Sequence, residues 1–263
     1  MKNKITTPTM ESVHTYGIIG FPLSHSFSQN YFNNKFKTLD INAQYVNFQI
    51  ENINEVHKLI ESHPKLMGLN VTMPYKEQII PFLDEIDCET EKIGAVNVVK
   101  IIRTQEKVIL KGYNTDIFGF ENSLKPLLKK HHKKALIFGT GGAARAVGYV
   151  LGKLNIEHIF VSRFSYSENL VYENVTSEII NEHKIVINTT PIGMYPNIEQ
   201  CPNINFSGFT NEHLAYDLIY NPQTTQFLQK ASENGATIKN GKEMLILQAE
   251  ETWKIWNRTN TRT

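Results

Sequence analysis

The feature that most constrains the fold is an alternation of short apolar runs with helical patterns, which starts at about Thr15. This alternation is typical of a parallel or mixed α/β sheet, because parallel strands need a crossover segment between them. Pro126 and the basic run 129–134 interrupt it, and a second α/β series begins at Ala135. The first 115 residues could fill one domain. We interpret the basic run as a solvated helix end and turn.

The expected strands and helices follow from the spacing of apolar residues along the two series. The last helix places Leu245, Ala249, Trp253 and Trp256 on one stripe. We expect strands at 16–20, 44–50, 67–72, 95–102, 108–113, 135–138, 158–162, 184–188 and 214–219, and helices at 25–37, 53–62, 141–154, 224–233 and 242–256, with one more opening at 114–116.

Composition excludes several classes of function. The 263 residues carry 27 Lys and Arg against 26 Asp and Glu, so charge gives no case for binding nucleic acid or an anionic membrane. Cys88 and Cys201 cannot form a disulfide framework, and neither has zinc-site spacing to a second Cys or His. No run approaches the about 18 apolar residues of a membrane span. We expect a cytoplasmic protein without a metal, a nucleic-acid partner or a membrane partner.

A glycine-rich turn follows the apolar strand at 135–138. Gly139, Gly141 and Ala144 match the pattern G-x-G-x-x-G/A, and an apolar helix follows. In a dinucleotide site the first glycine permits the tight turn, the second lets a pyrophosphate approach the backbone, and the small third residue lets helix pack on strand. An ordinary glycine turn is the alternative, but the strand–turn–helix context favours dinucleotide binding.

Two other strand ends carry polar side chains. Ser24, Ser26 and Ser28 provide hydroxyls beside a helix start, where a carboxylate could bind, although simple capping is the favoured explanation for these serines taken alone. Lys76 follows the strand at 67–72 in the expected first turn of a helix, where the helix dipole disfavours a cation. That position hints at a functional lysine, with a solvated side chain as the alternative.

Three further residues are less specific singly. Asp116 could be a helix-capping carboxylate, Gln248 lies beside the apolar stripe of the last helix, and Tyr220 stands at a strand end before Asn221-Pro222. Read in order, all these segments resemble the shikimate dehydrogenase family over nearly the whole chain. The matching segments are Gly20 to Ser28, Asn70 to Lys76, Gly94 to Asn97, Gly112 to Asp116, the glycine turn, Asp217 to Pro222 and Gly241 to Ala249.

The resemblance implies two α/β domains. Residues 1–115 with 238–263 would form the substrate-binding catalytic domain, and residues 116–237 a Rossmann-like NADP-binding domain. The activity implied is the NADPH-dependent, reversible reduction of 3-dehydroshikimate to shikimate, in the biosynthesis of chorismate and aromatic amino acids, by a monomer or homodimer acting on a small molecule. By analogy, Lys76 and Asp116 are catalytic; Ser26, Ser28, Thr72, Asn97, Tyr220 and Gln248 bind substrate; Gly139, Gly141, Gly142, Ala143, Ser162, Arg163 and Gly241 bind cofactor.

The choice of NADP over NAD depends on the strand end at 159–163. Sites that prefer NAD place an acidic residue about 20 residues beyond the glycines, and this strand end has none. Arg163 instead offers a cation for a 2′-phosphate, with an ordinary surface arginine as the alternative. The family commonly has a hydroxyl residue where this chain has Phe164, and Ser162 or Ser165 could substitute for it.

Two alternatives to this function stay open at the level of sequence. A quinate/shikimate dehydrogenase with broader substrate range or NAD use would carry nearly the same substrate motifs. A non-catalytic shikimate-binding regulatory homologue would keep the scaffold without turnover, although a pure binder has no need for both Lys76 and Asp116.

Overall fold

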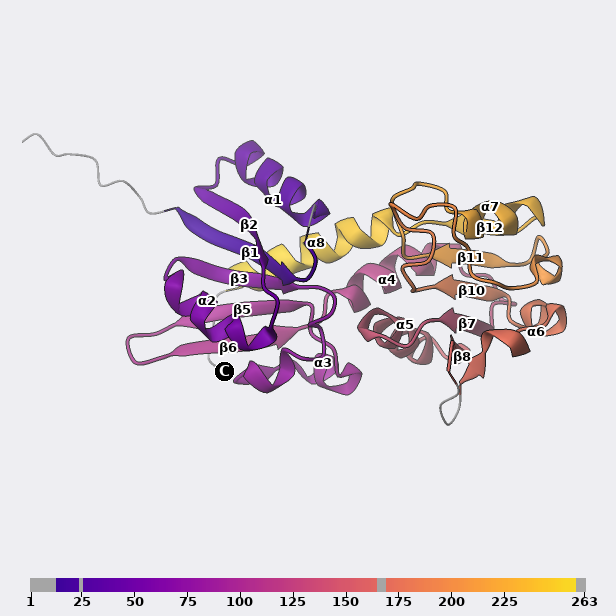
Figure 1. Cartoon of the computed structure of the whole chain (residues 1–263), viewed down its shortest axis with the longest axis horizontal. Coiled ribbons are helices and arrows are strands. Elements are labelled where there is room, and N and C mark those ends of the chain that lie inside the picture. Colours follow the sequence, from indigo (N-terminus) through magenta and orange to yellow (C-terminus); the bar gives the residue numbers. More distant parts are fainter. Residues whose placement is uncertain (1–12, 24–25, 165–168, 259–263) are drawn as a thin grey trace, which may run out of the picture. The chain divides into compact units, whose positions relative to one another are not determined.

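The computed structural model describes residues 13–23, 26–164 and 169–258 (Figure 1). Ser24, His25 and Ser165, which belong to predicted motifs, lie outside these ranges. The chain divides into two compact units, and each is described by itself. The first holds the chain up to Asp87 and Val96–Tyr113, and the second holds Cys88–Ala95 and the chain from Asn114 onward.

The first unit is a mixed sheet with helices. Its strand order is β2-β1-β3-β5-β6-β4, with β1, β2 and β3 parallel and β5 antiparallel to both of its neighbours. Ile19, Leu66 and Leu69 are fully buried in its core. The elements are β1 (His14–Gly20), α1 (Phe27–Thr38), β2 (Ala43–Gln49), α2 (Val56–Ser62), β3 (Leu66–Val71), β4 (Glu85–Ile86), β5 (Val98–Arg103) and β6 (Val108–Tyr113), with 3-10 turns at Ile53–Glu55 and Ile80–Phe82.

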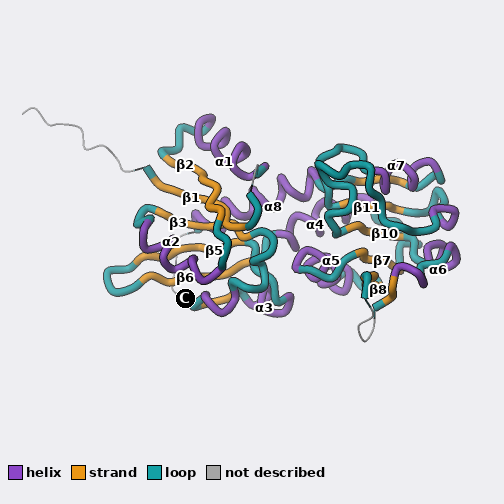
Figure 2. The backbone as a smooth tube through the Cα atoms, in the orientation of Figure 1, coloured by secondary structure: helices purple, strands orange, loops and turns teal. Residues whose placement is uncertain are grey.

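The second unit is a parallel sheet of order β12-β11-β10-β7-β8-β9 (Figures 1 and 2). Counted from β7 as the first strand, this is the doubly wound dinucleotide-binding order 3-2-1-4-5-6, read from its other edge. The strands are β7 (Lys134–Phe138), β8 (Glu157–Ser162), β9 (Leu170–Val171), β10 (Ile185–Asn188), β11 (Leu214–Asp217) and β12 (Thr237–Lys239); the helices are α3 (Cys88–Ile93), α4 (Asp116–Leu124), α5 (Gly142–Lys153), α6 (Ser177–Glu182), α7 (Gln226–Glu233) and α8 (Lys242–Asn257).

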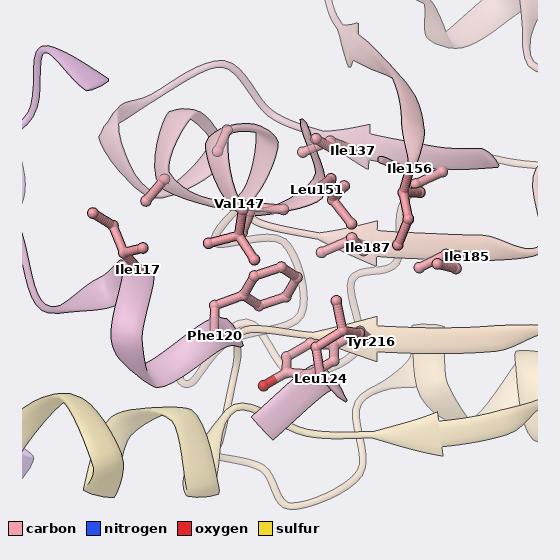
Figure 3. Close-up of a cluster of buried hydrophobic side chains, with 14 of the residues drawn as sticks. Ile117, Phe120, Leu124, Ile137, Val147, Leu151, Ile156, Ile185, Ile187 and Tyr216 are labelled. Carbon is pink, nitrogen blue, oxygen red and sulfur yellow. The ribbon is translucent and has the colours of Figure 1, made fainter. Parts of the chain in front are cut away.

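Apolar side chains from α4, α5 and the sheet form one core of the second unit (Figure 3). Phe120 of α4 is fully buried, and its ring meets that of Tyr216 on β11 edge-on at 5.2 Å between centroids. Val147 of α5 and Ile187 of β10 complete the contact. Each such side chain contributes about 1.5–3 kcal/mol by leaving water, so this core fixes α4 and α5 on the strands that carry the glycine turn.

Helices α4 and α8 pack closely on each other. A Cβ on Gly119 would lie 2.5 Å from the carbonyl oxygen of Met244, so only glycine permits this approach. The C-terminal helix is therefore grouped with the second unit, whereas the sequence assigned residues 238–263 to the substrate domain. The functional boundaries stay a prediction.

The structure corrects two expectations about exposure. On α8 the expected stripe is buried only in part: Ala249 and Trp256 are buried, whereas Leu245 and Trp253 are half-buried. The buried face also includes Gln248 and Thr252, which contact Thr115 at the start of α4. In the basic run 129–134, His132 is only 4% exposed and its Nε2 bonds the carbonyl oxygen of Glu212 at 3.0 Å. That run is therefore partly anchored rather than fully solvated.

Candidate active site

In the first unit, two predicted substrate residues meet at the carboxyl edge of the parallel strands. Thr72 follows β3, and its backbone N–H donates to the carbonyl of Ile19 on β1 at 3.0 Å. Asn97 precedes β5, and its carbonyl accepts the N–H of Val71 at 2.8 Å. Since β5 is antiparallel to β3, the start of one strand lies beside the end of the other. The side chain of Asn97 is buried at this edge.

Both predicted serines belong to the start of α1. Ser26 caps the helix: its hydroxyl accepts the N–H of Gln29 at 3.1 Å and donates to Oδ1 of Asn47 at 2.8 Å. The capping alternative is thus observed for Ser26. Capping leaves open a second role, because an N-terminal first turn also presents unpaired N–H groups to an anion.

Ser28 enters a buried chain of hydrogen bonds that sequence reasoning missed. Its hydroxyl bonds the phenol of Tyr45, whose O–H donates to Oδ1 of Asn70 at 2.8 Å. The amide of Asn70 in turn donates to the carbonyl of Asn97 at 3.3 Å. Burial holds the pKa of Tyr45 well above its ordinary value, so the phenol is a neutral donor. The chain links Ser28 to Asn97 across three strands.

Lys76 lies in a turn, and the helix expected at this point does not form. The segment after Thr72 makes successive turns, with the N–H of Tyr75 donating to the carbonyl of Thr72 at 2.9 Å. The carbonyl of Lys76 accepts the N–H of Val96 at 2.7 Å, so a segment distant in sequence takes the acceptor that a helix would need. The helix-dipole argument for Lys76 therefore fails. The residue is half-buried, and its backbone is bonded to Val96, the neighbour of Asn97.

Asp116 and Gln248 come together in the second unit. Asp116 is the first residue of α4, as expected, and its side chain is 7% exposed. The hydroxyl of the preceding Thr115 donates to Oε1 of Gln248 at 3.3 Å and contacts the hydroxyl of Thr252 at 3.1 Å. The amide of Gln248 donates to the carbonyl of Leu245 at 3.0 Å. The pairing of α4 with α8 therefore brings a carboxylate and a carboxamide to one place.

Tyr220 and Gly241 lie on neighbouring segments beyond β11. The N–H of Gly241 donates to the carbonyl of Ile219 at 3.0 Å, and any Cβ on Gly241 would collide with the carbonyl of Leu218. Gly241 is thus required for packing at the start of α8. Tyr220 is 37% exposed, and burial of its phenol raises the pKa of that group.

The glycine turn has the geometry of a dinucleotide site. Gly139 has φ +110°, a conformation that favours glycine, and Thr189 Oγ1 would lie 2.5 Å from a Cβ there. Gly141 is the N-cap of α5, with open space where a side chain would stand. Gly142 and Ala143 follow in the first turn, whose N–H groups have no partner within the helix. Because β8 and β10 flank β7 on opposite sides, the turn sits at the topological switch point.

The strand end at Ser162 is engaged internally. The hydroxyl of Ser162 donates its proton to the carbonyl of Phe164 and accepts the amide N–H of Asn169 at 2.7 Å. It therefore could not donate to a phosphate without breaking the first bond. Arg163 is exposed, with its guanidinium 5.8 Å from the centre of the Phe164 ring.

A buried network at the ends of β10 and β11 was not found from the sequence. Asp217 is fully buried and bonds Asn188, which stands opposite it in the strand register. Asp217 was noticed only as one residue of a motif. Two polar residues that each end an apolar run were the available signal, but their pairing depends on a register that a single sequence does not reveal.

Comparison with known proteins covers both units. The family model described as shikimate dehydrogenase substrate binding domain matches residues 18–99. A protein of Methanosphaera stadtmanae named shikimate dehydrogenase (NADP(+)) is 38% identical over 258 residues, spanning 91% of this chain and 90% of its own length. This chain belongs to the shikimate dehydrogenase family.

Solved shikimate dehydrogenases share the fold. The crystal structure of the enzyme from Aquifex aeolicus superposes with a TM-score of 0.81 at 36% identity, covering 95% of this chain and 94% of that one. The enzyme from Thermus thermophilus, solved in complex with NADP(H) and shikimate, gives a TM-score of 0.81 at 27% identity, covering 93% and 94% of the two chains. Both confirm the expected α/β fold with a Rossmann-like unit.

Two features are absent from the residues that the structure describes. None of their helices is at once long enough and apolar enough to cross a bilayer. Within the same residues, no group of three or more His, Cys, Asp and Glu side chains is arranged to hold a metal ion.

Proposed function

We propose that this protein catalyses the NADPH-dependent, reversible reduction of 3-dehydroshikimate to shikimate, a step of chorismate and aromatic amino acid biosynthesis. The observation that carries the proposal is the 38% identity to a protein named shikimate dehydrogenase (NADP(+)), which spans 91% of this chain. The solved relative with NADP(H) and shikimate bound supports the same substrate and cofactor. No observation favours the two alternatives, a broader quinate/shikimate dehydrogenase or a non-catalytic binder.

The residues of the second unit fit NADP. Gly139 allows the tight turn, Gly141 leaves the backbone open to a pyrophosphate, and the first N–H groups of α5, at Gly142 and Ala143, follow directly. Arg163 provides a cation for the 2′-phosphate. Ser162 acts indirectly, since its hydroxyl proton is already bonded to Phe164. Gly241 permits the close packing of α8 beside this edge.

The remaining polar residues take the substrate. Ser26 and Ser28, at the start of α1, and the phenol of Tyr220 hold its carboxylate, because a helix start suits an anion. Ser26 and Ser28 would exchange their bonds to Asn47 and Tyr45 for the substrate. Thr72, Asn97, Asp116 and Gln248 take the ring hydroxyl groups.

Lys76 and Asp116 carry out the proton transfer that accompanies hydride transfer. Bound NADPH supplies the hydride for the ketone carbon, which leaves negative charge on the ketone oxygen. The ammonium of Lys76 stabilises that charge and donates a proton to the oxygen. In the reverse direction the neutral amine accepts the proton. Asp116 takes a substrate hydroxyl and so holds the substrate in register for the proton transfer.

The protein takes a small molecule as its partner and works in the cytoplasm, as a monomer or a homodimer. A neutral overall balance of charge, with 27 basic and 26 acidic residues, agrees with a partner that is neither nucleic acid nor an anionic membrane.

A spectrophotometric assay tests the function directly. The purified protein is given shikimate or quinate with NADP or NAD, and formation of reduced nicotinamide is followed by absorbance. We expect turnover with shikimate and NADP, and the highest kcat/KM for that pair. Equal or greater kcat/KM with quinate or with NAD would favour the broader dehydrogenase, and absence of turnover with every pair would refute the proposed function.

A further inference from the structure

A carboxylate with no exposed surface ends β11. Asp217 is 0% exposed and accepts three hydrogen bonds: from Nδ2 of Asn188 at 3.1 Å, from the N–H of Ile219 at 3.0 Å and from the hydroxyl of Thr225 at 2.6 Å. Thr225 also caps α7 by accepting the N–H of Leu228. One carboxylate therefore ties the end of β10, the turn after β11 and the start of α7.

The network continues into the loop after β10. Oδ1 of Asn188 accepts both the N–H of Thr190 at 3.1 Å and its hydroxyl at 2.6 Å, and Thr190 Oγ1 accepts the N–H of Ile192 at 3.3 Å. Farther along, the N–H of Tyr195 donates to the carbonyl of Asn221 at 3.3 Å. Loops 189–195 and 218–225 are thus joined at both ends.

These two loops border the residues assigned to cofactor and substrate. Thr189, next to Asn188, packs against Gly139 of the glycine turn and donates its hydroxyl to the carbonyl of Phe138 at 2.6 Å. Ile219, next to Tyr220, accepts the N–H of Gly241. A change at Asp217 would therefore displace residues next to the glycine turn and residues next to Tyr220, although the carboxylate itself has no contact with solvent.

The charge of Asp217 has an energetic cost to the fold. Burial raises the pKa of this carboxyl to about 6, against the opposing effect of the bonds from Thr225, Ile219 and Asn188. Among the described residues no basic side chain forms an ion pair with it. Cys201, which senses the charge of Asp217, has a pKa raised to about 11 by burial and is therefore neutral. A neutral side chain of the same shape would be cheaper to bury.

We propose that Asp217 is a positioning residue for the reaction: by holding Asn188, Ile219 and Thr225, it fixes the loops that border the glycine turn and Tyr220 in the arrangement that binds cofactor and substrate. The inference rests on the proposed function. It adds a residue that touches neither ligand and that no sequence argument assigned to the site.

The decisive variant is Asp217→Asn, which keeps the shape and one acceptor oxygen but replaces the other by an amide NH₂ facing Thr225. We expect kcat/KM for shikimate with NADP to fall about tenfold or more, because hydrogen bonds to charged groups are strong and small displacements at a site are costly. The Kd of NADP, measured by equilibrium dialysis, should rise. The free energy of unfolding at pH 8 should stay equal or increase, because the variant buries no charge.

The pH dependence of kcat/KM provides a second measurement. A purely structural role of Asp217 would leave this dependence unchanged. Protonation of Asp217 below about pH 6 resembles the substitution, since it removes the charge from the same oxygens. The ratio of kcat/KM between wild type and Asp217→Asn should therefore be largest above pH 7 and shrink towards pH 5. A ratio that does not change with pH would overturn the proposal.

Two variants of Thr225 test the partner of Asp217, and one variant of Asp40 controls for the loss of charge. Thr225→Val removes the hydroxyl donor with little change of volume and should lower kcat/KM and stability together, whereas Thr225→Ser retains the donor and should restore both. Asp40→Asn removes the same charge at an exposed position and should leave kcat/KM and the Kd of NADP unchanged.

The outcomes separate this inference from the proposed function. A wild-type protein that does not oxidise shikimate refutes the function. With an active wild type, unchanged kinetics in Asp217→Asn would overturn the positioning role alone. An Asp217→Asn protein that fails to fold, or whose free energy of unfolding falls in step with its activity, would assign Asp217 to stability and overturn the role as well.

Discussion

Around some of the predicted site residues, hydrogen bonds from distant segments hold the backbone in place. The turn that carries Lys76 is held by the N–H of Val96, which takes the carbonyl that a helix would have used. Ser26 caps α1, and Ser162 closes its own turn. Lys76, and Ser26 through its bond to Asn47, therefore depend on residues distant in the sequence, whereas Ser162 is held by its own turn.

Replacing Lys76 tests the proton donor. Lys76→Ala should lower kcat by about 10²–10⁴-fold, the usual contribution of a general acid or base, while the KM for shikimate changes by a modest factor. Steady-state kinetics in both directions measure this, with circular dichroism to verify the fold. Turnover near that of the wild type would remove Lys76 from the proposed mechanism.

Replacing Arg163 tests the choice of cofactor. Arg163→Ala should raise the KM for NADP about 10–100-fold, because hydrogen bonds to a charged phosphate are lost, and leave the KM for NAD nearly unchanged. Arg163→Lys keeps the charge without the planar fork and should fall between the two. An equal effect on both cofactors would show that Arg163 does not read the 2′-phosphate.

Long elements were predicted well from the sequence and short ones poorly. The strand at 108–113 has the predicted bounds, and the last helix ends one residue later than expected. The short elements α3, α6, β4, β9 and β12 were missed, because two to six residues carry too little periodicity to recognise.

The site was predicted in part, through motifs, and long-range contacts account for the rest. The glycine turn has the expected strand–turn–helix form. The helix expected at Lys76 was wrong because Val96, twenty residues away, captures its carbonyl. The Asn188–Asp217 pair needed the sheet register, and the buried face of α8 needed the contact with α4.

The close packing of α4 on α8 predicts how a substitution between the two helices changes the stability of the fold. Gly119→Ala should lower the free energy of unfolding by about 1–3 kcal/mol, because the new Cβ would overlap the Met244 carbonyl and force the helices apart. Gly152→Ala is the matched control: it lies exposed in α5, with the nearest atom 4.0 Å from the added Cβ, and should stabilise by up to about 1 kcal/mol. Denaturant unfolding measures both, and equal effects would contradict the proposed steric cause.

At the scale of the whole molecule, two buried histidines make stability depend on pH. His132 accepts the N–H of Lys129 on Nδ1 at 3.1 Å while its Nε2 bonds the carbonyl of Glu212. His213 likewise accepts the N–H of Thr210 at 3.0 Å and bonds the carbonyl of Ile180 at 2.9 Å. Burial is the main cause that lowers the pKa of both groups, and it outweighs the backbone hydrogen bonds, which act in the opposite direction.

The sign of that effect follows from proton uptake. Below about pH 6.5 the unfolded chain protonates these histidines and the folded chain does so only at lower pH, so stability is lost as the pH falls from 7 to 5. Replacing both His132 and His213 by Gln should flatten this slope in denaturant titrations. His14→Gln, at an exposed position, should leave the slope as in the wild type; a double variant with the full slope would contradict the assignment.

The bond between Thr115 and Thr252 joins residues 137 positions apart. During synthesis the strands of the first unit can pair once Tyr113 has emerged, since all of them precede it. Helix α4 emerges next but finds its partner only when α8 has left the ribosome. Asp116 and Gln248 therefore acquire their final surroundings late, and a nascent chain stalled within the second sheet would expose the face of α4 that α8 covers.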